Sequence, residues 1–211
     1  MAERGLTLAN ICIARGGSVL VELDRHIAEG EVLTVMGPSG AGKSTLLSLI
    51  IGTLGRDFTA TGRILLNSQD ITDLPPHARR VGILFQDDLL FPHLSVGENL
   101  AFGLSPDVKG RAARRTRIET ALDEIGLTGF ADRDPMTLSG GQKARVALMR
   151  MLLSDPCALL LDEAFSRLDT ARRDQIRALV FDYARKKGLP TLMVTHDMED
   201  ARAAGGQVIE I

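Results

Sequence analysis

The chain has 211 residues, enough for one ordinary domain with a sizeable core. Its 25 Lys and Arg residues nearly balance its 27 Asp and Glu residues, so composition gives no support for a duplex nucleic acid binder, which usually carries a strong basic excess. No apolar run approaches the roughly 20 residues that span a bilayer, and the N-terminus lacks the apolar stretch of a secretory signal. We expect a soluble chain that meets a membrane only through a partner.

Apolar patterning predicts alternating strands and helices. Residues 6–14 and 18–27 alternate apolar and polar positions, which is typical of strands with one exposed face. Later runs without alternation predict strands covered on both faces of a sheet, at 31–36, 81–85, 157–162 and 191–195. Helical spacing covers 43–52, 112–125, 140–153 and 171–187.

This order predicts an α/β fold with a mainly parallel sheet and an antiparallel N-terminal β region. Residues 87–140 hold no clear strand, so we expect them to form an inserted helical subdomain. The remaining residues, 1–86 and 141–211, are expected to form the α/β core, and the whole of 1–211 one domain.

The segment GPSGAGKST matches the phosphate-binding pattern G-x-x-x-x-G-K-[ST], between a predicted strand and a predicted helix. Its glycines let the backbone turn sharply and direct N–H groups inward, and the helix N-terminus adds to this anion site. Lys43 is expected to reach the β- and γ-phosphates, and Ser44 to offer its hydroxyl to Mg²⁺. The predicted nucleotide-binding residues are Gly37, Pro38, Ser39, Gly40, Ala41, Gly42, Lys43, Ser44 and Thr45.

A second apolar strand ends in two carboxylates, Asp162 and Glu163. Asp162 is expected to hold Mg²⁺, and Glu163 to orient or deprotonate the attacking water. Phosphoryl transfer needs positioning and charge neutralisation more than covalent chemistry, so these parts suffice. By itself such a pair is as often a solvated strand end, but the phosphate loop upstream favours the metal site.

The segment LSGGQ at 138–142 resembles the signature of ATP-binding-cassette (ABC) ATPases, and it lies upstream of the carboxylate strand as in that family. Ser139 is expected to cap a helix, and Gly140 and Gly141 leave backbone N–H groups open to an anion. The resemblance implies that Ser139, Gly140, Gly141 and Gln142 contact the γ-phosphate of an ATP bound to a second copy.

Further segments resemble the remaining motifs of that family. Gln86 matches the glutamine that contacts the Mg²⁺ and water site and couples to the membrane subunit. Asp169, in SRLD, matches the carboxylate of the D-loop, and His196, in VTHD, matches the γ-phosphate sensor. The resemblance implies a P-loop NTPase of the ABC type, with ATP as substrate together with Mg²⁺. It implies that Glu163, His196 and Gln86 are catalytic. It also implies that Ser44, Gln86 and Asp162 bind the metal.

Residues 74–104 are similar to the corresponding part of bacterial importer ATPases of the thiamine, iron, polyamine, molybdate and maltose group. In that group the segment forms a groove for the membrane subunit, and the exporter-type segment before the signature has no match at 131–137. The resemblance implies a homodimer on the cytoplasmic face of the inner membrane, held there by permease subunits. It also implies a periplasmic substrate-binding protein as an indirect partner, and no nucleic acid.

Two departures from the family pattern stand out. The position where an aromatic usually stacks on adenine is occupied by Ala14 and Arg15, and Ala164 follows Glu163 where importers usually have Pro.

Three alternatives compete with an importer. Non-transport cassette ATPases carry long insertions or a second cassette, and neither is present here. A lipoprotein-release or efflux cassette is disfavoured by residues 74–104, and a free-standing NTP-binding regulator would have no membrane partner. The basic run 111–117 is interspersed with acidic neighbours, which indicates a solvated helix face.

Overall fold

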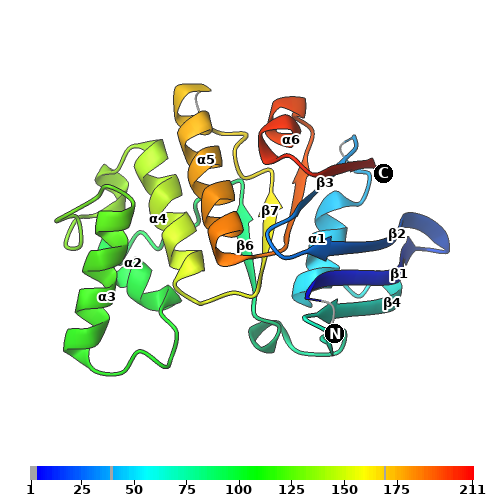
Figure 1. The fold of residues 1–211 in the computed structure, drawn as a ribbon, viewed down its shortest axis with the longest axis horizontal. Helices are drawn as coiled ribbons and strands as arrows, with labels where there is room; N and C mark the ends of the chain where they lie inside the picture. The colour runs from blue at the N-terminus through cyan, green and yellow to red at the C-terminus, as the bar shows by residue number, and fades with distance from the viewer. Residues whose placement is uncertain (1–3, 39, 169) are drawn as a thin grey trace.

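The computed structural model describes residues 4–38, 40–168 and 170–211 (Figure 1). Within these residues a four-stranded antiparallel sheet has the order β2-β1-β4-β5, formed by Ser18–Ala28, Gly5–Arg15, Phe58–Leu66 and Gln69–Asp70. A five-stranded parallel sheet has the order β6-β7-β8-β3-β9, formed by Val81–Phe85, Ala158–Asp162, Thr191–Thr195, Val32–Met36 and Gln207–Glu210.

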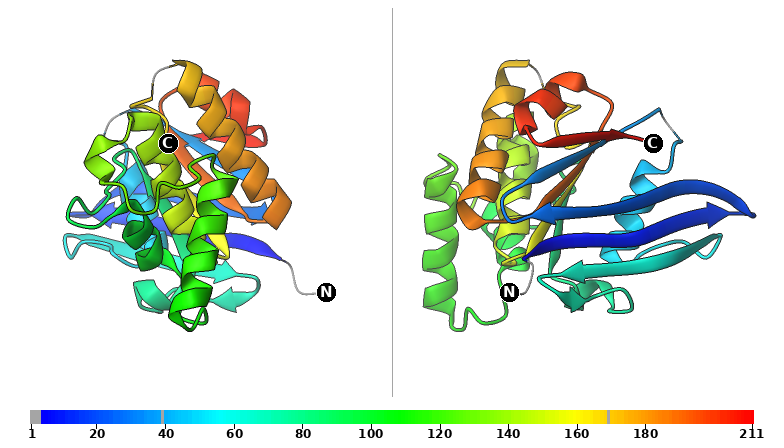
Figure 2. Two further views of the ribbon diagram at one scale, coloured as in Figure 1. Left: turned by 90° about the vertical axis from the view of Figure 1, so that its left-hand side faces the viewer. Right: turned by 45° about the vertical axis from the view of Figure 1, so that its right-hand side comes forward.

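Helices connect the strands of the parallel sheet. They are α1 (Lys43–Ile51), α2 (Val96–Gly103), α3 (Arg111–Glu124), α4 (Gly140–Leu152), α5 (Thr170–Lys187) and α6 (Met198–Ala204), with 3-10 turns at Pro76–Ala78 and Pro135–Thr137. Figure 2 shows the antiparallel strands on the opposite side of the molecule from α3 and α4. None of the helices in the described ranges is long and apolar enough to cross a bilayer.

The parallel sheet is covered on both faces, as its non-alternating strands predicted. In β7, Leu159 and Leu161 pack into a core shared with α2, α3, α4 and α5. Leu160, between them, points to the opposite face and packs into a core shared with α1 and the antiparallel sheet. Successive side chains of a strand alternate between faces, so an entirely apolar strand is required here.

The observed elements confirm the predicted α/β fold class, and the strands and helices that were predicted lie within a residue or two of their expected bounds, whereas β4, β5, β9 and α6 were not predicted. Residues 86–157, all of them described, contain α2, α3 and α4 and no strand. Helix α2 was not predicted by its spacing, although Ser95 and Glu98 form a capping box at its start. The division into an α/β core and a helical subdomain at 87–140 stays a prediction.

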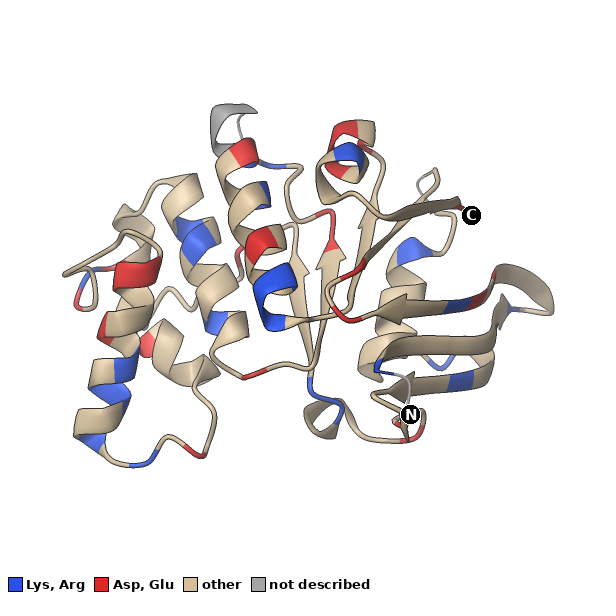
Figure 3. Ribbon diagram, in the orientation of Figure 1, with Lys and Arg blue, Asp and Glu red and all other residues tan. Residues whose placement is uncertain are grey.

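Basic and acidic residues are spread over many of the helices, strands and loops (Figure 3). On α3 the basic run contains Arg115, which pairs with Glu119 at 2.8 Å, and Arg117, which lies 3.8 Å from Glu124. Their side chains are partly or largely exposed, so these pairs add little stability.

Arg79 ties the segment before β6 to the end of α1. Arg79 is 5% exposed, and its guanidinium donates to the carbonyls of Leu49 and Ile50 at 2.9 and 2.8 Å. It also donates to the carbonyls of Leu74 and Thr72. Carbonyls at a helix C-terminus lack partners within the helix, so a buried cation satisfies them.

We predict that Arg79→Met destabilises the protein by about 3 kcal/mol, because buried carbonyls lose a charged donor. Urea unfolding measures the change. The control is Arg80→Met, since Arg80 is exposed and donates to one carbonyl, that of Asp155. It should cost less than about 1 kcal/mol, and equal losses for the two variants would refute the role of Arg79.

Candidate functional site

The register of the parallel sheet brings the predicted site segments to one edge. Phe85 pairs with Asp162, Asp162 with Val194, and Val194 with Val35. The carboxyl ends of these strands therefore lie side by side, where ligands of open α/β sheets bind. The loops that leave this edge carry Gln86, Glu163, His196 and the phosphate loop.

The phosphate loop runs from β3 into α1. Gly40 and Gly42 have φ of 86° and 93°, a region that favours glycine. A Cβ at Gly42 would lie 2.7 Å from Val21 Cγ2, so the antiparallel sheet also excludes a side chain there. Gly37 is equally confined, because a Cβ would lie 2.5 Å from the Ile211 carbonyl. The glycines thus shape a loop whose last residues open the helix.

Lys43, the first residue of α1, is only 7% exposed. Its ammonium donates to the carbonyls of Gly37 and Pro38 at 2.7 and 2.9 Å. The loop therefore folds over its own lysine, which fixes the cation beneath the segment expected to hold phosphate. Ser44 is exposed, and Ala41 and Thr45 are half-buried beside it. Ser39 lies outside the described residues.

The two motifs meet at Ser44 and Asp162, because the Ser44 hydroxyl donates to Asp162 Oδ1 at 3.4 Å. Burial raises the pKa of the Asp162 carboxyl, the hydrogen bond from Ser44 partly offsets this, and Glu163 raises it further. A hydroxyl and a carboxylate this close supply the oxygen ligands that Mg²⁺ prefers. The residues present therefore fit a magnesium ion at this position.

Glu163 and His196 come from neighbouring loops and contact each other. Glu163 Oε1 lies 3.2 Å from His196 Nδ1, and the Glu163 N–H donates to the Val194 carbonyl at 3.0 Å. Glu163 has φ of 46°, a conformation that non-glycine residues rarely adopt. Such backbone strain is typical of functional sites, where surrounding contacts enforce it.

The signature segment lies on another element. Ser139 caps α4 by accepting from the Gln142 N–H at 3.4 Å, and Gln142 Oε1 accepts from the Ser139 N–H at 2.9 Å. Ser139 and Gly140 are exposed, with nothing within 4 Å of a Cβ at Gly140, and Gly141 is buried. Among the described residues, no hydrogen bond or ion pair joins this segment to the phosphate loop. Figure 1 shows α4 and α1 on opposite sides of α5 and β7.

Gln86 is exposed and directly follows β6. The residue before it, Phe85, is the one that pairs with Asp162. The sheet thus brings Gln86 to the same edge as the two carboxylates. Asp169 lies outside the described residues.

The structure adds an aromatic residue that sequence proximity could not reveal. Phe58 opens β4 and pairs with Arg15 across the antiparallel sheet, with the Arg15 guanidinium 5.4 Å from the ring centroid. Asp57 lies 3.9 Å from the same guanidinium. The position that lacks an aromatic in the sequence therefore has one beside it in space, because β4 is distant in the chain but adjacent in the sheet.

A phosphate loop that leads from strand β3 of a parallel sheet into a helix, with carboxylates at the end of β7, one strand removed in the same sheet, defines a P-loop nucleoside triphosphatase. The profile of one known family, described as ABC transporter, matches residues 20–166. The chain therefore belongs to the ABC transporter family, of which it is an ATP-binding, ATP-hydrolysing subunit.

Similar proteins include the Uncharacterized ABC transporter ATP-binding protein YnjD of Escherichia coli K12, which is 51% identical over 88% of this chain and 85% of its own length. The Thiamine import ATP-binding protein ThiQ of Cereibacter sphaeroides is 46% identical over 90% of this chain and 81% of its own length. The protein of the same name from Jannaschia sp. strain CCS1 is 43% identical over 97% and 87%. These likenesses confirm the importer-type assignment and do not favour the efflux or non-transport alternatives.

We predict that Glu163→Gly is more stable than Glu163→Ala by about 1 kcal/mol, because glycine adopts positive φ without the Cβ penalty. At ordinary positions glycine is the less stabilising of the two residues. Both variants lack the carboxylate, so urea unfolding isolates the backbone effect. A more stable alanine variant would show that the turn is not strained.

Proposed function

We propose that two copies of this chain bind two ATP molecules head to tail, and that hydrolysis drives a bacterial importer permease. The contact among Ser44, Asp162, Glu163 and His196 at the strand ends supports this proposal most strongly. Phosphoryl transfer needs groups that position the reactants and neutralise charge, and these four side chains are suited to both tasks.

Within one copy, Lys43 and the loop amides neutralise and orient the phosphates. Ser44, Asp162 and Gln86 hold Mg²⁺, which supplies further charge neutralisation when bound. Glu163 accepts a proton from the attacking water, and His196, 3.2 Å from Glu163, orients this carboxylate and senses the γ-phosphate. Together these residues need only hold the reactants in line.

The second copy completes the site. Ser139, Gly140, Gly141 and Gln142 open α4, whose N-terminal N–H groups form an anion site away from this chain's own phosphate loop. In a two-fold dimer this helix end meets the γ-phosphate on the partner copy. ATP then stabilises the closed dimer by its contacts in that state alone, and hydrolysis removes them.

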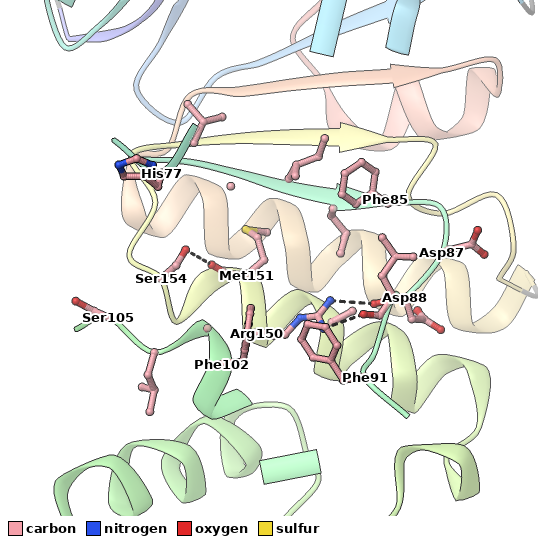
Figure 4. Close-up of a pocket in the computed structure, with 18 of the residues that line it drawn as sticks. His77, Phe85, Asp87, Asp88, Phe91, Phe102, Ser105, Arg150, Met151 and Ser154 are labelled. Carbon is pink, nitrogen blue, oxygen red and sulfur yellow. Dashed lines mark hydrogen bonds between the residues drawn. The ribbon is translucent and has the colours of Figure 1, made fainter. Parts of the chain in front are cut away.

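A groove of about 680 Å³ offers a place for the permease (Figure 4). It runs between β6 and α4, its lining residues fall within 77–106 and 147–154, and the apolar ones include Phe85, Leu89 and Phe102. The Phe102 side chain is 70% exposed, a large apolar area for a protein surface. We infer that permease subunits hold the chain here, peripherally, on the cytoplasmic face of the inner membrane. A periplasmic binding protein delivers substrate to the permease.

We predict that Glu163→Gln lowers ATP hydrolysis by roughly 10²–10⁴-fold, because Gln keeps the reach of Glu but accepts no proton. Nucleotide binding survives, since Lys43 and Ser44 are unchanged. ATP with Mg²⁺ should therefore shift this variant from monomer to dimer, and ADP should not. Gel filtration with light scattering reports the mass.

The control for the composite site is Ser139→Arg in the Glu163→Gln background. A bulky cation at the start of α4 blocks the approach to the phosphate, so the shift to dimer should disappear. A Glu163→Gln variant that hydrolyses ATP at the wild-type rate, or one that stays monomeric at saturating ATP, would contradict the proposed mechanism.

We predict that Phe102→Asp abolishes co-purification with the permease and leaves ATP binding unchanged, because it places a charge in the apolar groove. The matched control is Ala113→Asp, at an exposed position of α3 outside the groove lining. A substitution of Leu90, in the same segment, would be a less suitable test, because Leu90 is half-buried and packs against the core. An undiminished complex with Phe102→Asp would place the permease elsewhere.

A further inference from the structure

The loops after β7 and β8 carry Glu163 and His196, and their contact depends on how these loops sit together. Hydrogen bonds between near neighbours shape each loop. Glu163 nevertheless has positive φ, and the next residue is Ala164, which leaves the turn free where a proline would fix φ. His196 is largely exposed, with 62% of its side chain accessible. A contact that reaches both loops would therefore add to the local hydrogen bonds.

Arg173, one turn into α5, reaches both loops. Its guanidinium donates to Asp197 Oδ2 at 2.7 Å and to the Ser166 carbonyl at 3.2 Å. Ser166 in turn donates to the Glu163 carbonyl through its hydroxyl at 2.9 Å and its N–H at 3.1 Å. Asp197 directly follows His196. The Arg173 side chain is therefore linked to Glu163 through Ser166, by two successive hydrogen bonds. It is linked to the His196 loop through Asp197, the residue after His196.

Asp197 is itself fixed. It caps α6 by accepting from the Glu199 N–H at 2.8 Å, and its own N–H donates to Thr195 Oγ1 at 3.0 Å. The hydrogen bond from Glu199, followed by Arg173 and Arg177, lowers the pKa of the Asp197 carboxyl. The acceptor of Arg173 therefore stays ionised at neutral pH, and a bond between two charged groups is stronger than one between neutral groups.

A second arginine of α5, Arg177, also supports the loop that carries His196. Arg177, one turn further along α5, is 4% exposed and donates to Asp200 Oδ1 at 2.6 Å. Asp200 is 1% exposed and accepts from Thr195 Oγ1 at 3.0 Å, which fixes the residue before His196. Residues four apart share a helix face, so both arginines lie on the side of α5 that faces the two loops.

We propose that Arg173 is a positioning residue that keeps Glu163 and His196 in contact by bridging the Ser166 carbonyl and Asp197, with the Arg177–Asp200 pair as its foundation. This inference rests on the proposed roles of Glu163 and His196. A planar guanidinium can serve both acceptors at once, whereas a lysine ammonium offers no such fork. Removing the bridge lets the two loops separate without altering the phosphate loop.

The test compares Arg173→Ala and Arg173→Lys with Arg185→Ala. Arg185 lies on the same helix and pairs with Asp182 at 2.8 Å, but it is exposed and far along α5 from both loops. We expect kcat for ATP hydrolysis to fall about 10²-fold for Arg173→Ala, the loss that a small misplacement produces. KM should change less than about threefold, because binding rests on Lys43 and Ser44. Arg185→Ala should match the wild type.

A double-mutant cycle separates positioning from general stability. If Arg173 acts through the contact of Glu163 with His196, Arg173→Ala should cost little more once His196→Ala is present, because residues acting as a unit are non-additive. Independent, multiplying losses would overturn the proposal, as would a kcat within about threefold of wild type for Arg173→Ala. If Arg173→Ala fails to fold, the same cycle with Arg173→Lys decides.

Failure of this inference and failure of the proposed function give different results. Wild-type hydrolysis by Glu163→Gln would remove the catalytic base and with it both proposals. Loss of hydrolysis by Glu163→Gln together with full hydrolysis by Arg173→Ala would overturn only the bridging role.

Discussion

The alignment of four parallel strands at their carboxyl ends is the constraint on which the site depends. Register between β6, β7, β8 and β3 places Phe85, Asp162, Val194 and Val35 in one row. Whatever follows each strand must then emerge at the same edge, so residues far apart in the chain meet there. The apolar cores on both faces of the sheet hold this register, because the side chains of each strand are packed against specific neighbours on both sides.

Local backbone geometry then converts this edge into a place for anions and a base. Gly42 has positive φ and lies against Val21, so only glycine fits where the loop enters α1. Glu163 also has positive φ but carries a side chain, for which we propose the role of general base. The first position is free of strain and the second is strained, which explains why the Glu163 turn needs support from α5 while the phosphate loop supports itself through Lys43.

The two anion-binding helix ends differ in where they face. Helix α1 begins beneath its own phosphate loop, and α4 begins with exposed Ser139 and Gly140 on a separate element. The proposed pairing of two chains would bring these two helix ends to one nucleotide. The groove with Phe102 lies between β6 and α4, and β6 is also the strand that Gln86 follows.

The sequence alone determined the fold class, the phosphate loop and the signature, because each depends on short-range spacing. Glycines at 40 and 42, Lys43 and the Ser139–Gln142 capping box act on their immediate neighbours, so the chain order reveals them. Only the tertiary structure decided which distant residues meet. Sheet pairing and helix packing produce three such contacts. They bring Phe58 beside Arg15, Ser44 to Asp162, and Arg173 between the loops of Glu163 and His196. No local pattern encodes such contacts, because they join segments that the sheet and its helices, rather than the chain order, bring together.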